Sequence, residues 1–220
     1  MGEILKGRAA TMLTVHHLRL SQSERIVWLC EELGIDYELK LYNRREDNRL
    51  APDEYKALHP MGIAPVITDD GFVLGESGAI IDWIISKYGD RGLVPPKDHP
   101  DFADHLFYYH WANATFMTNG MMGLVCQFLG SAPPPFVADR IEKGWAIVEK
   151  RLGEADYFGG GELSTADIMM GFQLTTSRAM SGMSIDHMPN LKAYLKRIGE
   201  RPAYQRAMVK AEPGMPPKLD

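Results

Sequence analysis

The sequence predicts two domains, a mixed α/β domain followed by an all-helical one. Strand signals are confined to the first part of the chain, where short apolar or alternating runs are separated by turn residues. After the stretch GDRGLVPPKDHP at 89–100, which is rich in Gly, Pro and charge, only helical periodicity remains. We therefore place the α/β domain at residues 11–90, a linker at 91–100 and the helical domain at 101–220.

Composition and charge narrow the classes of function. The chain has 220 residues, of which 45% are hydrophobic and 24% charged, which is typical of a globular protein. A net charge of −5 without a basic block argues against nucleic acid as a partner. No apolar run approaches the roughly 20 residues that span a membrane, so no membrane partner is expected. The first residues, MGEILKGRAAT, lack the apolar core of a secretory signal and are expected to form a short extension.

Cysteine usage favours a reducing compartment. The two cysteines, Cys30 and Cys126, are far apart, form no CxxC motif and fall in apolar helical stretches. Free cysteine packs as a small hydrophobic residue, so both are expected to be buried reduced thiols. This usage is consistent with a cytoplasmic location.

The first domain follows the order β-α-β-α-β-β-α. Strands are expected at 12–18 and 36–42, and a helix after the N-cap residue Ser23 ends at Gly34. Because a helix separates these two strands, they are expected to pair in parallel. A second helix at 52–58 is followed by a hairpin whose turn is DDG, and by a further helix. This order matches a thioredoxin-like fold.

The second domain is predicted to contain a strongly capped central helix. Ser164 stands three residues before Asp167, and Leu163 and Ile168 occupy the positions of a hydrophobic staple. Each cap interaction contributes about 1 kcal/mol, so these residues are interpreted as folding determinants. One or two helices are expected over 101–130, and single helices at 136–152, 164–177, 190–199 and 202–210.

Two features with binding chemistry lie in the stretch HPMGIAPVITDDGFVLGESGAIIDWII, from His59 to Ile85. Ala64-Pro65 directly precedes a strand, where proline cannot donate to the hydrogen-bond ladder and belongs in a special turn. Glu76-Ser77 stands at a helix start, where free N–H groups and a hydroxyl can hold a carboxylate. Together they predict a binding loop beside a helix N-terminus.

This stretch resembles the glutathione-binding half of a glutathione transferase. The resemblance implies a loop with a cis proline, whose neighbouring backbone holds the cysteinyl part of glutathione, and a Glu-Ser pair that holds its γ-glutamyl end. The opening VHHLxxSxSxRxxWLxEELG and the capping box extend the likeness from about residue 12 to about residue 210. The corresponding binding-loop residues here are Pro60, Gly62, Ile63, Ala64, Pro65, Val66, Glu76 and Ser77.

The resemblance also implies a catalytic serine in the loop after the first strand. Ser21 and Ser23 are both candidates, with Ser21 the better aligned and Ser23 also explained as a helix cap. A hydroxyl bonded to a thiolate contributes about 1.5–3 kcal/mol, and a helix N-terminus about 0.3–1 kcal/mol. Their sum could lower a thiol pKa of about 8.5 by roughly two units. His16 and His17 are expected to be core or domain-contact residues. The loop contains no cysteine, which argues against the Cys-type chemistry of other family members.

The sequence departs from the family pattern at two positions. Ile63 stands where a Lys, Arg or Gln often reaches the glycine carboxylate of glutathione, so Arg44, Arg45 or Arg49 is a candidate substitute, or these arginines are simply a solvated loop. Asn113 stands near a position where related sequences tend to carry an acid. Both departures predict weaker or altered glutathione binding.

An apolar pocket for the second substrate is expected between the domains. The first helical stretch of the second domain is dense in aromatic and Met residues, which suits an adaptable pocket but is equally typical of plain core. The candidate pocket residues are Tyr108, Tyr109, Trp111 and Phe116.

These inferences predict a glutathione transferase that conjugates the glutathione thiolate to a small hydrophobic electrophile. Glutathione would be a co-substrate, with no other cofactor and no metal, since no HxxH, HExxH or Cys cluster is present. The family usually forms homodimers, so a homodimer is expected. The alternatives are a glutathione-dependent peroxidase, isomerase or dehalogenase, or a non-catalytic binding protein, which Ile63 favours. The missing CxxC disfavours a thioredoxin-like reductase.

Overall fold

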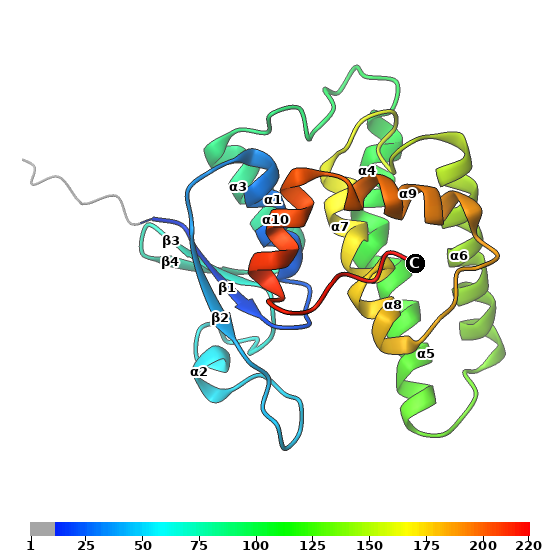
Figure 1. Ribbon diagram of the computed structural model, residues 1–220, viewed down its shortest axis with the longest axis horizontal. Coiled ribbons are helices and arrows are strands. Elements are labelled where there is room, and N and C mark those ends of the chain that lie inside the picture. The colour runs from blue at the N-terminus through cyan, green and yellow to red at the C-terminus, as the bar shows by residue number, and fades with distance from the viewer. Residues whose placement is uncertain (1–11) are drawn as a thin grey trace, which may run out of the picture.

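The computed structural model describes residues 12–220 and places a sheet-containing part beside a helical part (Figure 1). The expected N-terminal extension, residues 1–11, lies outside the described residues. Strands occur up to Gly75, and the helix that follows them ends at Tyr88. The helices of the second part begin at Phe102, after an irregular segment. This arrangement is the predicted α/β thioredoxin-like domain followed by an all-α domain.

Four strands form one mixed sheet in the order β2-β1-β3-β4. Strand β1 (Thr14–Leu18) pairs in parallel with β2 (Glu38–Tyr42) and antiparallel with β3 (Val66–Asp69). β4 (Phe72–Gly75) pairs antiparallel with β3. The predicted parallel pair and hairpin are both confirmed. The hairpin turn takes positive φ angles at both central residues, 47° and 84°, which its Asp-Gly sequence accommodates.

Three helices complete the first domain: α1 (Glu24–Leu33), α2 (Asp53–Lys56) and α3 (Ser77–Tyr88). Gly34 ends α1 in the left-handed conformation, as predicted. Ser23 precedes α1 as predicted, yet among the described residues its side chain makes no capping hydrogen bond. The reason is competition, because the Ser23 hydroxyl bonds to His17 Nδ1 at 2.7 Å instead.

The second domain differs from the sequence prediction at one helix, and its first helical stretch contains an irregular segment. The first helical stretch is continuous but contains a π-helical segment, and the predicted helix 164–177 breaks at Thr175, whose φ and ψ are −115° and −88°. The Thr175 hydroxyl donates to the Gly171 carbonyl at 2.9 Å, which satisfies that carbonyl at the break. The elements are α4 (Phe102–Trp111), η1 (Ala112–Met117), α5 (Thr118–Phe128), α6 (Pro135–Glu154), α7 (Thr165–Leu174), α8 (Thr176–Ser181), α9 (Pro189–Gly199) and α10 (Pro202–Ala211).

The predicted capping box at the start of α7 is confirmed. The Ser164 hydroxyl accepts from the Ala166 amide at 3.3 Å, and the Asp167 carboxylate accepts from the Ser164 amide at 2.9 Å. The other oxygen of Asp167 accepts from the Phe158 amide at 2.9 Å. Asp167 therefore ties the buried helix α7 to the loop before it.

The two domains share a buried interface. Helix α1 of the sheet domain packs against α10 and α7 of the helical domain. Glu32 of α1 receives two hydrogen bonds from the Arg201 guanidinium, at 2.8 and 2.9 Å, beside the start of α10. After α10 the chain returns across the helical domain, where the Arg178 guanidinium donates to the Lys218 carbonyl at 3.1 Å. Within residues 12–220 no helix is long and apolar enough to cross a membrane.

The two cysteines lie in different environments. Cys30 is fully buried in α1, and burial raises the pKa of its thiol well above the ordinary value. Cys126 on α5 is only half-buried, because α5 lies at the outside of the helical domain. The prediction of two free thiols is confirmed, and that of two buried ones is correct for Cys30 alone.

Candidate active site

The segments that carry the predicted site residues leave the sheet at one edge. β1 ends at Leu18, β3 begins at Val66 and β4 ends at Gly75. The antiparallel registers pair His16 with Val66, and Val66 with Gly75. These pairings bring the end of β1, the start of β3 and the end of β4 to the same side of the sheet. Three segments are therefore neighbours: the serine loop (residues 19–23), the proline loop (residues 60–65) and the start of α3.

The proline loop has the predicted conformation. The Ala64–Pro65 peptide bond is cis. Pro65 and Val66 are buried and Ala64 is half-buried, so the backbone here is held firmly at the sheet edge. The side chain of Ile63 is 57% exposed and stands at the outer end of the loop.

The start of α3 presents backbone donors beside a strained residue. Glu76 is exposed and has φ and ψ of 73° and 125°, a conformation that costs a non-glycine residue of the order of 1–3 kcal/mol and is concentrated at binding sites. Ser77 is buried at the first position of α3, where amide groups lack intrahelical acceptors. An anion placed here would meet free N–H groups and the positive end of the helix.

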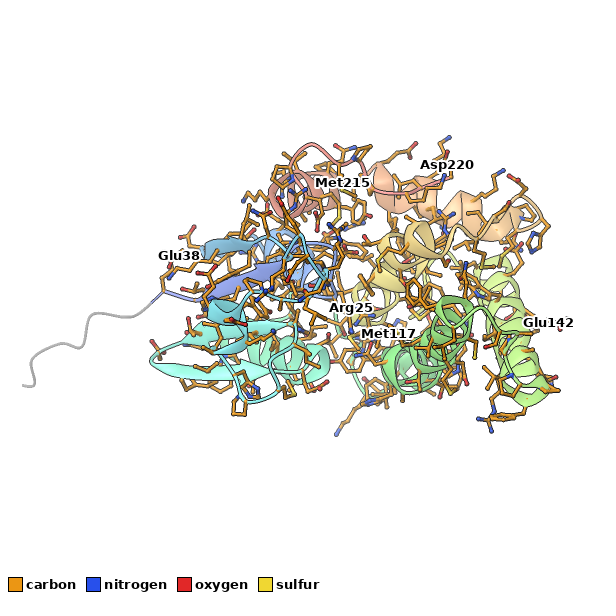
Figure 2. All side chains as sticks on the ribbon, turned by 90° about the horizontal axis from the view of Figure 1, so that it is seen from below. Arg25, Glu38, Met117, Glu142, Met215 and Asp220 are labelled. Atoms are coloured by element: carbon orange, nitrogen blue, oxygen red, sulfur yellow. The ribbon has the colours of Figure 1, made fainter. Side chains whose placement is uncertain are left out.

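Arg25 lies where the two domains meet (Figure 2) and bonds to residues of both. Its Nη1 donates to Gln22 Oε1 at 2.7 Å, to Asn113 Oδ1 of η1 at 2.8 Å and to Ser77 Oγ at 3.3 Å. The residue is 1% exposed, and its Nε and Nη2 atoms have no hydrogen-bond partner in the described part of the chain. Burial lowers the pKa of Arg25 to about 10, so the guanidinium is still charged at neutral pH.

The charge of Arg25 is only weakly balanced by its surroundings. Its hydrogen-bond acceptors are neutral, and the carboxylate of the adjacent Glu24 bonds instead to the Thr175 and Thr176 hydroxyls. Asn113, which lies near the position where related sequences tend to carry an acid, contributes an amide dipole and no charge. The result is a buried positive charge in direct contact with the Ser77 hydroxyl.

Ser21 and Ser23 lie together in the loop after β1. Their hydroxyl oxygens are 2.8 Å apart, and Ser21 Oγ also donates to the Leu18 carbonyl at 2.6 Å. Ser21 is 6% exposed, whereas Ser23 is fully buried. Gln22, between them, is 3.5 Å from the Ser77 hydroxyl, which links the serine loop to the start of α3.

The serine loop is held by Arg44 and Glu212, neither of which the sequence predicts in this role. The Arg44 guanidinium donates to the Arg19 and Leu20 carbonyls, both at 2.9 Å. The Glu212 carboxylate accepts from the Leu20 amide at 2.5 Å, from Arg19 Nε at 3.0 Å and from His17 Nε2 at 3.2 Å. Glu212 is separated from the loop by most of the chain, so no local pattern could have found it.

Arg44, Arg45 and Arg49 were candidates for the glycine end of glutathione. The contacts of Arg44 with the serine loop occupy its Nε and Nη2 atoms. Arg45 makes a two-point contact with Asp47, at 3.0 and 2.9 Å. Arg49 is exposed, and its side chain forms no hydrogen bond or ion pair within residues 12–220. Of the three, Arg49 has the guanidinium with most freedom to meet an incoming carboxylate.

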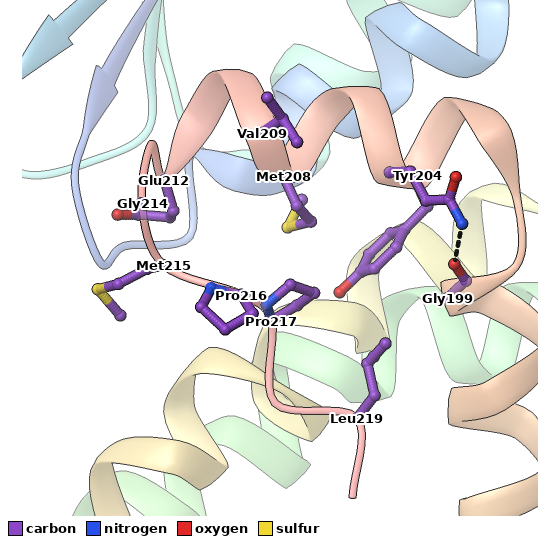
Figure 3. A pocket seen from close by; sticks show the side chains of 11 residues that line it. Gly199, Tyr204, Met208, Val209, Glu212, Gly214, Met215, Pro216, Pro217 and Leu219 are labelled. Atoms are coloured by element: carbon purple, nitrogen blue, oxygen red, sulfur yellow. Dashed lines mark hydrogen bonds between the residues drawn. The ribbon is translucent and has the colours of Figure 1, made fainter.

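An apolar hollow of about 370 Å³ lies against the serine loop. It is bordered by Leu20, the residue directly before Ser21, by Met180 of α8, and by Met208 of α10. The C-terminal segment forms much of its remaining wall and also borders a second hollow against α10 (Figure 3). Three of the residues that border the first hollow are Met215, Pro216 and Pro217.

The four predicted aromatic pocket residues lie elsewhere, in the interior of the helical domain. Tyr108 and Tyr109 are 7% and 6% exposed, and the Tyr109 hydroxyl donates to Asp82 at 2.7 Å. The Trp111 and Phe116 rings stack with their centroids 4.7 Å apart. None of the four is among the described residues that border the hollow beside Ser21.

Among the described residues, no group of three or more His, Cys, Asp and Glu side chains is placed to hold a metal ion. The sequence prediction of a reaction without metal or cofactor stays a prediction.

Two family models match the chain. Residues 21–87 match the N-terminal domain of glutathione S-transferases, and residues 131–206 match their C-terminal domain. The first match spans the serine loop, the proline loop and α3, and the second spans the capping box.

Proteins that are similar over most of this chain are also named glutathione S-transferases. Glutathione S-transferase 3 of Schizosaccharomyces pombe is 29% identical, with 91% of this chain and 88% of that protein covered. Glutathione S-transferase 1 of Saccharomyces cerevisiae is 27% identical, with 91% and 95% covered. A crystal structure of a glutathione S-transferase from Actinobacillus pleuropneumoniae is 32% identical, with 91% and 93% covered and a TM-score of 0.81.

Proposed function

The chain belongs to the glutathione S-transferase family, a family of enzymes that conjugate glutathione, and we propose that Ser21 is the residue that stabilises the glutathione thiolate. The cysteinyl backbone of glutathione would pair beside the cis Ala64–Pro65 bond, against Val66. The γ-glutamyl carboxylate would bind at Ser77, and Glu76 would meet the γ-glutamyl amine. The thiolate then attacks an apolar electrophile.

One observation carries this assignment: the serine loop, the cis-proline loop and the start of α3 meet at one sheet edge, joined by the contacts of Gln22 and Arg25 with Ser77. Each segment alone has many explanations. A bound tripeptide needs backbone partners, an anion site and a hydroxyl donor in one place, and this edge supplies all three. The weakly balanced charge of Arg25 favours a carboxylate at Ser77.

Ser21 is favoured over Ser23 by its position. Ser21 lies nearer the surface and borders Leu20 of the apolar hollow, whereas Ser23 is fully enclosed. A hydroxyl bonded to a charged sulfur contributes about 1.5–3 kcal/mol. That contribution lowers a thiol pKa by about one to two units. Glutathione, whose thiol pKa is about 8.5, would then be substantially ionised at neutral pH.

The electrophile would occupy the hollow between Leu20, Met180 and Met215. Its apolar wall favours a small hydrophobic molecule, and the flexible Met side chains permit several shapes. This position differs from the predicted pocket, because Tyr108, Tyr109, Trp111 and Phe116 are buried and none of them borders this hollow.

A cytoplasmic homodimer is part of the same proposal. Helices α4 and α5 keep large apolar side chains exposed, among them Phe107 at 49% and Met121 at 49%. Apolar surface of this kind is a common site of subunit contact. The low cysteine content and net charge of −5 are consistent with a cytoplasmic protein. Analytical ultracentrifugation would give the mass of the assembly.

The first test compares the wild type with Ser21→Ala by calorimetric titration of glutathione and by conjugation to chlorodinitrobenzene. We expect the wild type to bind with a Kd of millimolar or tighter. Ser21→Ala should keep that Kd within a few-fold and lose about 10- to 150-fold in kcat, because one charge-assisted hydrogen bond is removed. Ser131→Ala, which changes an exposed serine far from the sheet edge, is the matched control. A wild type without binding heat, or an undiminished kcat in Ser21→Ala, contradicts the proposal.

A further inference from the structure

A buried chain of hydrogen bonds runs from the serine loop to the end of α10. Ser21 Oγ is 2.8 Å from Ser23 Oγ, and Ser23 Oγ is 2.7 Å from His17 Nδ1. His17 Nε2 is in turn 3.2 Å from Glu212 Oε1. His17 and Ser23 are fully buried, and Ser21 and Glu212 are 6% and 5% exposed. These hydrogen bonds thus connect Ser21, the proposed hydrogen-bond donor to the thiolate, with a buried imidazole.

The position of each proton follows from the partners. Burial alone would raise the pKa of Glu212, but hydrogen bonds from His17, the Leu20 amide and Arg19 lower it below its ordinary value. A carboxylate only accepts hydrogen bonds, so His17 carries its proton on Nε2. In a neutral imidazole the other nitrogen is an acceptor. Nδ1 therefore accepts from the Ser23 hydroxyl, and the single proton of Ser21 is shared between Leu18 and Ser23.

His17 lies among charges of both signs. Glu212 contacts its ring directly, and Arg19 contacts the other oxygen of Glu212 at 3.0 Å. Arg44 binds the loop carbonyls on the far side, and Glu24 is close enough to Glu212 for mutual repulsion. A proton added to Nδ1 would create an imidazolium that is paired with Glu212 and keeps a hydrogen bond to Ser23.

We propose that His17 holds, through Ser23 and Ser21, the proton that the glutathione thiol loses on binding. This inference rests on the proposed function, and it assigns His17 and Glu212 as positioning residues that do not touch the substrate. The sulfur–hydrogen bond breaks and its proton passes to Ser21 Oγ. The hydroxyl proton of Ser21 passes to Ser23 Oγ, and that of Ser23 passes to His17 Nδ1. The products are one thiolate and one imidazolium, so charge and protons balance within the site.

After the proton transfer, each hydroxyl in the series donates its hydrogen bond in the direction of the sulfur. After the transfer, His17 Nδ1–H donates to Ser23 Oγ, Ser23 donates to Ser21, and Ser21 donates to the thiolate. Before the transfer the same bonds run in the opposite direction, from Ser21 toward the imidazole. A catalytic loop with a serine alone would release the thiol proton to water, and this difference is measurable.

The test counts the protons released for each thiolate formed. The thiolate is followed by its ultraviolet absorption at pH 7 and the protons by calorimetry in two buffers of different ionisation enthalpy. We expect the wild type to form thiolate while releasing close to zero protons. In His17→Gln the acceptor is removed, so thiolate at pH 7 should fall, by up to about 30-fold if the bound thiol returns to its ordinary pKa of about 8.5. At alkaline pH it should return with one proton released per site.

His16→Gln is the matched control, because His16 is a neighbouring buried histidine that bonds to Tyr42 and Thr68 instead of the serines. It should behave as the wild type in both measurements. Ser23→Ala keeps His17 and Ser21 but breaks the connection, and it should behave as His17→Gln. It also serves if His17→Gln fails to fold. Glu212→Gln, which removes the counter-charge, should raise the number of protons released.

The outcomes separate the His17 proposal from the proposed function. A wild type that forms thiolate and releases one proton per site overturns the His17 proposal and leaves the proposed function standing. The His17 proposal alone also fails if Ser23→Ala keeps the proton count and thiolate level of the wild type. A wild type that binds glutathione without forming thiolate overturns the thiolate chemistry itself, and the His17 proposal with it.

Discussion

At the scale of single residues, the candidate site contains buried charged groups that are not paired with an opposite charge through a hydrogen bond. Arg25 is charged and buried without a bonded carboxylate, and Glu24 beside it turns to two threonine hydroxyls. Burial raises the pKa of Glu24 to about 7, chiefly through loss of solvation. Such groups link the protonation of the protein to its stability.

Glu24→Gln is expected to stabilise the protein at alkaline pH. A carboxyl whose folded pKa of about 7 exceeds its ordinary 4.5 destabilises the fold above pH 7, and the penalty disappears as pH falls toward 4.5. The substitution should therefore add up to about 3 kcal/mol at pH 8 and close to nothing at pH 4.5. Urea denaturation at both pH values measures this. Glu46→Gln, at an exposed position, is the control. An equal gain at both pH values would refute the assignment.

Ile63→Lys is expected to tighten glutathione binding. The exposed Ile63 lies beside the cis proline, and an ammonium there could pair with the glycine carboxylate of glutathione. An exposed ion pair contributes about 0.2–1 kcal/mol, so Kd should fall by up to about fivefold. The gain should shrink at high salt. Titration calorimetry measures it, with Ile63→Met as the uncharged control. If Lys and Met give the same Kd, no carboxylate lies near this position.

At the scale of elements, the helical domain places two contacts that local periodicity does not predict. The π-helical segment η1 interrupts the first long helix and brings Asn113 within 2.8 Å of Arg25. The break at Thr175 starts α8 afresh, so that the Thr175 and Thr176 hydroxyls both meet Glu24. Both irregularities occur where the helical domain contacts α1, and such bulges are frequent at functional sites.

Asp167→Ala is expected to destabilise the protein strongly. The Asp167 carboxylate satisfies the buried amides of Ser164 and Phe158, and its loss leaves both without that acceptor. Each unsatisfied amide costs about 1–3 kcal/mol, so a loss of roughly 2–5 kcal/mol should appear in urea denaturation. Asp139→Ala removes an exposed pair with Lys143 on α6 and should change stability by less than about 0.5 kcal/mol. Similar losses in the two variants would rule out a special role for the capping box.

At the scale of the whole molecule, the sheet domain and the helical domain form one unit around α1. The helix packs against α10 and α7, and its Glu31 and Glu32 carboxylates pair with Arg206, Lys210 and Arg201. The site depends on this packing, because Glu212 reaches the serine loop only when α10 is docked. The conformation of the serine loop and the association of the domains are therefore linked.

Glu32→Ala is expected to lower stability without separating the domains. Removing the carboxylate leaves the Arg201 guanidinium and Trp28 Nε1 without the acceptor that each uses, at a cost of about 1–3 kcal/mol. Tryptophan fluorescence and far-UV circular dichroism should still report one coincident transition. Glu200→Ala, at an exposed i,i+4 pair, is the control. Two separate transitions in the wild type would show that the domains unfold independently.

Sequence patterns predicted the fold because its determinants are local. The Asp-Gly turn, Gly34 after α1, and the Ser164–Asp167 box each need only neighbouring residues to act, and all three are present. The cis conformation of the Ala64–Pro65 bond was predictable from nearby residues too, whereas the role of this loop in glutathione binding stays a prediction. Ser23 shows the limit of such reasoning, because a tertiary partner, His17, took its hydroxyl from the predicted cap.

What the sequence by itself determined is therefore the order of elements, the two domains and the segments that carry the site. Only the tertiary structure decided which side chains meet: Glu212 with the serine loop, Asn113 with Arg25, and the C-terminal segment with the apolar hollow. It also placed the four predicted pocket residues in the core: Tyr108, Tyr109, Trp111 and Phe116. The physical reason is that turns and caps depend on adjacent residues, whereas buried polar groups take whichever partner the packing of distant elements brings within hydrogen-bond distance.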